Sequence, residues 1–192
     1  MATTGPTANL RNRLNHGLTS QAAANELLNL VPKLAYVNTA ASTTVGAVST
    51  ETAFDKSYTI PAGTLTVGSV IKVRYYGFGV AGSGSDTFAH KLYIGGTGGT
   101  AVVTSAAAQL ATNSTFTGEA EIVVRTIGNS GSAVAIGTYK QSSAEGTMTV
   151  KDDYTASFTL NTNTTQQLVV TGTWNTTNST SARLDVLKVE VS

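Results

Sequence analysis

The sequence contains one pattern that phosphate-binding proteins use. Gly77, Gly79 and Gly82 form a GxGxxG motif directly after the alternating segment 70–76. In a dinucleotide-binding fold this motif leads from a strand into a helix, whose free backbone N–H groups bind the pyrophosphate. Here the turn-forming residues 83–86 follow, and no acidic residue lies about 20 positions further on to bind a ribose. We therefore expect no nucleotide cofactor at these glycines.

Two carboxylates are spaced for glycosidic chemistry. Glu119 and Glu121 are two residues apart in a strand-like segment, so their side chains face the same way. Paired carboxylates can act as the acid and the base of glycoside hydrolysis. However, Ala120 and Ile122 alternate with them and Arg125 lies nearby, which favours a solvent-exposed polar strand face over a catalytic pair.

Few other residues could carry chemistry. The 192 residues include no cysteine, which excludes disulfides and cysteine nucleophiles. His90 shares a strand face with apolar residues, so we expect it to be buried and hydrogen-bonded. Asp152 and Asp153 lack the surrounding pattern of a calcium-binding loop. We expect no catalytic residue, no cofactor and no metal ion, and hence no enzymatic activity.

The segments that would position these side chains alternate with a period of two. In residues 70–76 apolar side chains face one way while Lys72 and Arg74 face the other, which is typical of a half-buried strand. In residues 184–191 the apolar face changes midway, which predicts a bulge or a strong twist. Turn residues separate many such short segments, and no helical period intervenes. We expect an all-β fold, a jelly-roll β-sandwich, over residues 48–192.

The N-terminal residues have a different pattern. Leu10, Leu14 and Leu18 recur every four residues, which predicts a short amphipathic helix, and a second helix-forming run follows at residues 21–31. Two such helices bury too little apolar surface to be stable alone. We expect residues 1–47 to form a short helical arm and a linker. The arm would dock on a partner or cover one end of its own β-domain.

Charge and hydropathy exclude two classes of partner. The chain has 12 basic and 11 acidic residues and a net charge of +1, which does not suit a nucleic-acid-binding protein. No apolar run approaches the roughly 20 residues that a membrane helix needs, and the opening residues lack the apolar core of a secretory signal. We therefore expect neither a nucleic-acid nor a membrane partner.

Residues 51–97 resemble the first half of a jelly-roll module found in many structural proteins of tailed bacteriophages. The resemblance is carried by a strand end Tyr-Thr-Ile-Pro-Ala at 58–62, a Gly-Ser-Val-Ile strand at 68–71 and a Leu-Tyr-Ile-Gly-Gly strand at 92–96. The later segments 118–125, 168–174 and 184–191 are similar to its middle strand and closing pair. Residues 10–14 and 20–28 are similar to the N-terminal arm that some of these proteins carry.

The resemblance implies a non-enzymatic virion protein, often a homotrimer, that either reinforces or decorates the capsid exterior or forms part of a fibre. We expect the first of these, a protein made in the host cytoplasm and placed on the capsid exterior. It would be a capsid decoration (cement) protein that binds the major capsid protein as a homotrimer and stabilises the shell. The residues of the arm that would contact the shell or a neighbouring copy are Leu10, Arg11, Arg13, Leu14, Leu27 and Leu30.

The alternative is a receptor- or glycan-binding adhesin domain of a head or tail fibre. It would use its loops and exposed tyrosines, for which Tyr76, Tyr93 and Tyr139 are the candidates. A carbohydrate-active enzyme that uses Glu119 or Glu121 is a third and weaker hypothesis, because jelly rolls carry all three functions.

Overall fold

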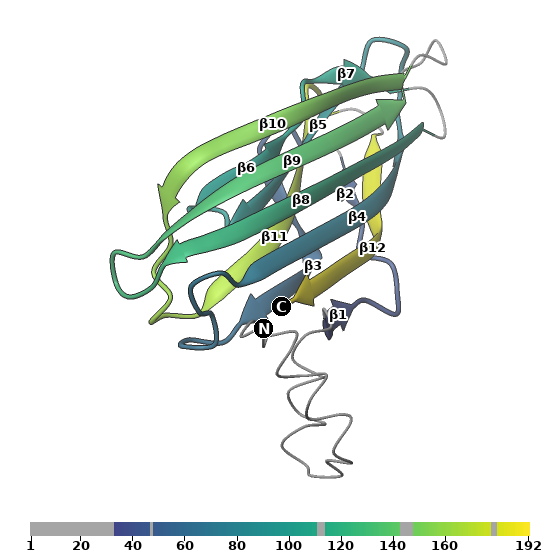
Figure 1. Ribbon diagram of the computed structural model, residues 1–192. Coiled ribbons are helices and arrows are strands. Elements are labelled where there is room, and N and C mark those ends of the chain that lie inside the picture. The colour runs from purple at the N-terminus through teal and green to yellow at the C-terminus, as the bar shows by residue number, and fades with distance from the viewer. Residues whose placement is uncertain (1–32, 47, 111–113, 143–147, 178–179) are drawn as a thin grey trace, which may run out of the picture. The chain divides into compact units, whose positions relative to one another are not determined.

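The computed structural model describes residues 33–46, 48–110, 114–142, 148–177 and 180–192. The chain divides into two compact units, Met1–Lys33 with Ser192 and Leu34–Val191. The expected helical arm falls in residues 1–32 and lies outside the described residues. The second unit contains the sheets (Figure 1).

Twelve strands occur in the described part of the chain. They are β1 (Lys33–Val37), β2 (Val45–Gly46), β3 (Thr52–Ile60), β4 (Val70–Val80), β5 (Thr87–Ile94), β6 (Thr100–Thr104), β7 (Ala108–Gln109), β8 (Ser114–Thr126), β9 (Ser132–Ser142), β10 (Met148–Thr159), β11 (Gln166–Trp174) and β12 (Ser181–Val191). The prediction of an all-β fold is confirmed for these residues.

The strands form two antiparallel sheets that pack face to face as a sandwich. The seven-stranded sheet has the order β1-β12-β4-β8-β9-β10, with β2 also paired to β12. The five-stranded sheet has the order β3-β11-β5-β6, with β7 also paired to β5. Figure 1 shows the larger sheet in front, with β10 along its upper edge, and the smaller sheet behind it.

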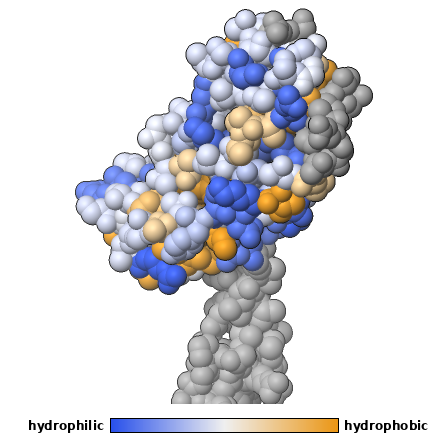
Figure 2. Space-filling model, turned by 90° about the horizontal axis from the view of Figure 1, so that it is seen from above, coloured by the Kyte–Doolittle hydropathy of each residue, from blue (hydrophilic) through white to orange (hydrophobic). Residues whose placement is uncertain are grey.

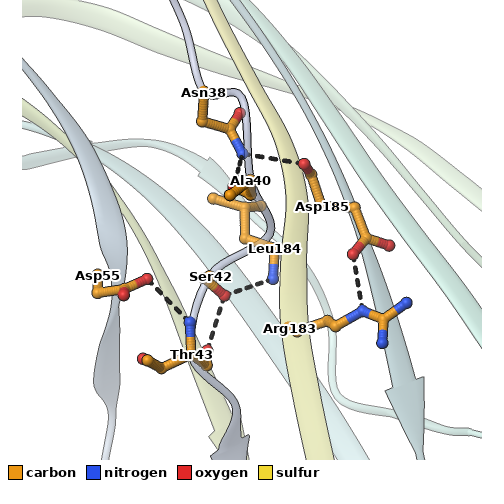
Figure 3. A network of polar contacts seen from close by, with 8 residues as sticks. All are labelled: Asn38, Ala40, Ser42, Thr43, Asp55, Arg183, Leu184 and Asp185. Atoms are coloured by element: carbon orange, nitrogen blue, oxygen red, sulfur yellow. Dashed lines mark hydrogen bonds and ion pairs between the residues drawn. The ribbon is translucent and has the colours of Figure 1, made fainter.

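The sandwich begins earlier than the expected residue 48. Strands β1 and β2 both pair with β12, so the compact unit starts at Leu34. The segment between them is polar, and its side chains continue the pairing (Figure 3). Ser42 Oγ accepts a hydrogen bond from Leu184 N at 2.8 Å, and Asn38 Oδ1 accepts one from Leu187 N. Alternating hydropathy could not identify pairing that depends on polar side chains.

The predicted irregularity in the last strand is confirmed. The register between β12 and β4 shifts between Leu184 and Val186, which moves the apolar side chains after this point onto the core face. Asn38 lies beside this shift, and its Nδ2 donates to the Asp185 carbonyl oxygen at 2.9 Å (Figure 3). The segment of Asn38 and Ser42 therefore satisfies backbone groups that the bulge leaves out of the regular ladder.

Aromatic rings fill the centre of the sandwich. The Phe88 ring lies 4.9 Å from the Trp174 ring and 5.0 Å from the Phe116 ring, so this cluster joins the two sheets. Glycines make room for the rings: a Cβ at Gly77 would overlap the Phe116 ring, and one at Gly118 would overlap the Tyr75 ring. Each glycine is directly opposite the ring's own residue on the neighbouring strand, Gly77 opposite Phe116 and Gly118 opposite Tyr75.

Adding a methyl group at these glycines tests the packing. We expect Gly77→Ala and Gly118→Ala each to lower the free energy of unfolding by about 2–3 kcal/mol, because the buried rings must shift. Gly84→Ala is the matched control, since a Cβ there meets open space, and it should change stability by less than about 0.5 kcal/mol. Chemical denaturation of the three variants measures both effects. Equal effects at all three positions would contradict the packing.

Candidate functional site: the outer face of the seven-stranded sheet

The GxGxxG motif forms part of a strand. Strand β4 continues through Gly77 and Gly79 to Val80, and both glycines face the core. A turn then follows, in which Asp86 Oδ2 accepts a hydrogen bond from Ser83 N at 2.6 Å. The glycines are required because Phe116 and Leu110 occupy the space where their Cβ atoms would lie. The motif therefore packs aromatic and aliphatic side chains, and no helix N-terminus follows it.

His90 is buried in the aromatic cluster, as predicted. Its side chain is 1% exposed, and its Nδ1 lies 2.8 Å from the Tyr75 hydroxyl oxygen. Burial lowers the pKa of His90 to about 3 and raises the pKa of Tyr75. Both groups are therefore neutral at neutral pH, with Tyr75 as the donor and His90 Nδ1 as the acceptor. The neutral imidazole is enclosed by aromatic rings and has no contact with solvent, so it is not placed to act as a general base.

The paired carboxylates lie on the outer face of the seven-stranded sheet. Glu119 forms a two-point ion pair with Arg74, with Nε–Oε1 at 3.0 Å and Nη2–Oε2 at 3.2 Å. Glu121 lies 3.4 Å from Lys72 Nζ, and about half of each side chain is exposed. The interaction with Glu119 raises the pKa of Arg74. The prediction of a polar, solvent-facing strand is confirmed.

These ion pairs belong to two rows of charges that cross three strands. The register places Lys188, Arg74 and Glu119 in one row and Glu190, Lys72 and Glu121 in the next. They line a groove of about 350 Å³ together with Ile136 and Thr138. Every charge in the groove has an opposite charge beside it, so the groove presents a neutral, hydrogen-bonding surface.

Beside the charged rows the same face becomes apolar. Ile136 on β9 and Tyr154 on β10 are directly opposite each other, and they are 56% and 73% exposed. Met148 and Val150 on β10 are 56% and 55% exposed and share this face. Figure 2, which views the molecule from above, shows apolar side chains in several separate places among hydrophilic ones. Residues 148–159 are polar overall, so hydropathy alternation does not predict a strand there and this row has no signal in the sequence.

The three candidate tyrosines occupy different environments. Tyr76 is 40% exposed on the outer face of β4. Tyr93 is partly buried, with its hydroxyl 3.2 Å from Lys91 Nζ. The interpretation of Tyr139 was wrong: it is 1% exposed and its hydroxyl oxygen accepts a hydrogen bond from Ala106 N at 3.0 Å. It lies on the inner face of β9, where most of the other inward residues are small. The alternation of large apolar and polar residues that marks a strand face is therefore missing from the sequence here.

A second polar cluster lies on the five-stranded sheet. Lys91 Nζ donates to Glu51 Oε2 at 2.8 Å, and Thr171 Oγ1 donates to Glu51 Oε1 at 2.7 Å. Partial burial opposes ionisation of Glu51, but these hydrogen bonds outweigh it and lower the pKa of that carboxyl group. No sequence pattern predicts this cluster, because Lys91 and Thr171 are 40 and 120 residues from Glu51 along the chain.

The predicted arm residues cannot be compared with this site. Leu10, Arg11, Arg13, Leu14, Leu27 and Leu30 all lie outside the described residues. Within the described ranges no group of three or more metal-ligating side chains comes together. Among the same residues no helix is long and apolar enough to cross a membrane.

Comparison with known proteins does not place the chain in a family: no protein-family model matches it, and no curated protein matches it.

The burial of His90 predicts acid sensitivity. Its pKa is about 3 in the folded protein against 6.5 ordinarily, so between these values only the unfolded chain binds the proton. The free energy of unfolding should therefore fall by about 1.4 kcal/mol for each pH unit between about 6.5 and about 3. Urea denaturation of the native protein and of His90→Gln, which keeps an acceptor for Tyr75, measures this difference. Parallel pH profiles for the two proteins would contradict the buried neutral state.

Proposed function

We propose that this chain is a non-enzymatic structural protein of a bacteriophage virion. In this proposal it is a capsid decoration (cement) protein, which binds the major capsid protein on the outer surface of the shell as a trimer and stabilises it. The observation that carries the proposal is the strand order, since it agrees with the fold that the resemblance to phage proteins implies.

The strand order supports a jelly roll. One sheet contains β1-β12-β4-β8 as neighbours and the other contains β3-β11-β5-β6. These eight strands form two four-stranded sets. The chain crosses between the sheets from β2 to β3, β3 to β4, β4 to β5, β7 to β8, β10 to β11 and β11 to β12. This arrangement is the one expected of two Greek keys. In this interpretation β9 and β10 form a hairpin that extends one sheet beyond β8.

The states of the candidate chemical groups also support a structural role. Glu119 and Glu121 are each held by a basic side chain on β4, and His90 is neutral and enclosed. The fold depends on packed rings and on the hydrogen-bonded segment of Asn38 and Ser42, and the chain has no cysteine. A protein of this kind keeps its structure in the reducing cytoplasm where phage shells assemble and in the oxidising medium outside.

Attachment to the shell is assigned to the N-terminal arm. Arg11 and Arg13 would pair with carboxylates of the major capsid protein, and the leucines at positions 10, 14, 27 and 30 would be buried at that contact. Three arms on one trimer would bind together, so that modest contacts from each arm give durable attachment.

Charge reversal in the arm tests this attachment. We expect Arg11→Glu/Arg13→Glu to weaken co-sedimentation of the full chain with phage shells at least about tenfold, because each arginine loses a carboxylate partner. Arg125→Glu/Lys140→Glu makes the same change of charge on exposed strand positions and should bind like the native chain. Equal binding by both variants would contradict the role of the arm. Binding to host cells instead of shells would favour the adhesin alternative.

A further inference from the structure

Strand β10 is an open edge of the seven-stranded sheet. Among the described strands it pairs only with β9, and Figure 1 shows it along the upper border of the sheet. It has 12 residues, and its pairing with β9 is regular from Met148 to Thr155, before the register shifts ahead of Phe158. An edge of this length presents a row of backbone N–H and C=O groups to which another strand can bind.

The outward side chains of β10 are mostly apolar. Met148, Val150 and Tyr154 face outward together with Asp152, and Tyr154 is 73% exposed. Large apolar side chains on an open edge make pairing with another strand more favourable, since cross-strand contacts would bury them.

The inward side chains of β10 interact with the facing sheet. Asp153 Oδ2 accepts a hydrogen bond from Thr104 N at 2.7 Å, and Thr155 Oγ1 donates to the Ala101 carbonyl oxygen at 3.4 Å. These bonds join β10 to β6 of the facing sheet. Asp153 Oδ1 lies 3.8 Å from Lys151 Nζ, which is beyond hydrogen-bond range, and the Lys151 side chain is 63% exposed.

The charges of β10 are arranged symmetrically about Asp152. Charged side chains usually prevent edge strands from pairing. Here, however, a two-fold axis through Asp152 places Lys151 of one copy opposite Asp153 of the other, and does so twice. The same axis places Val150 opposite Tyr154 and Thr149 opposite Thr155. Opposite charges, an aromatic with a β-branched residue, and two threonines are all stabilising cross-strand pairs.

We propose that β10 is a self-association edge, at which two copies of this chain pair antiparallel about Asp152. The partner is a second copy because the pattern from Thr149 to Thr155 is complementary to itself, as an isologous interface requires. The regular part of the strand ends at Thr155, which is the residue that this axis places opposite Thr149. The inference does not rest on the proposed function.

Neighbouring registers lack this complementarity. An axis one residue earlier places Lys151 opposite Lys151, and an axis one residue later places Asp153 opposite Asp153. Either shift loses both pairs of opposite charge. The cost of the favoured register is one like-charged pair, Asp152 with its copy, and each of these carboxylates accepts a hydrogen bond from Thr138 Oγ1 at 2.6 Å.

Complementary charge variants test the pairing. Light scattering over a concentration series measures the mass of the full chain in solution. Lys151→Asp and Asp153→Lys should each halve this mass and raise the dissociation constant for self-association at least about tenfold. Each variant alone places like charges opposite each other. An equimolar mixture of the two restores both opposite pairs and should recover the native mass, which a loss of folding in either variant could not produce.

Two further variants separate the edge from general surface effects. Val150→Asp should also halve the mass, whereas Val67→Asp, at a loop position that is 63% exposed, should not. Asp152→Asn should strengthen association, because it removes the like-charged pair on the axis while keeping an oxygen for Thr138. Two results would overturn the proposal. One is a mass that stays at the native value in Lys151→Asp, Asp153→Lys and Val150→Asp; the other is an equimolar mixture that stays dissociated.

Discussion

The packing of aromatic rings directly on backbone glycine is the interaction on which the rest of the sandwich depends. Phe116 and Tyr75 lie on adjacent strands, and each ring occupies the space that a side chain on the opposite residue, Gly77 or Gly118, would fill. The Phe116 ring then reaches across the interior to Phe88, and the Tyr75 ring reaches His90, so the two rings join the two sheets. Because this contact supplies the cohesion, the outer faces of the sheets need not contribute to the core.

Because the core holds the sheets together, the outer face of the larger sheet can change from charged to apolar from one strand to another. Across β12, β4 and β8 it carries charges that neutralise one another, and at β10 it carries exposed apolar side chains on an open edge. The first surface contributes little to stability and resists nonspecific association. The second is suited to contact with another protein surface.

Sequence reasoning found the features that follow a strict period. Alternation identified β4 and the polar face of Glu119, and the change of face within residues 184–191 identified the bulge in β12. Alternation did not predict the features in which the place of a residue depends on contacts with residues distant in the sequence. Asn38 and Ser42 pair with β12 through their side chains, and Tyr139 alternates with small residues. The glycine at position 77 makes room for the ring of Phe116, which is 39 positions away along the chain. None of these contacts leaves a local pattern.

The copy number of this chain in purified virus particles tests the proposed function most directly. Quantitative mass spectrometry of particles from the source of the chain would give its ratio to the major shell protein. A decoration protein should be present at a stoichiometry near that of the shell protein, because it covers repeated positions on the capsid. A few copies per particle would contradict decoration and favour a fibre, and absence from the particles would contradict the virion assignment.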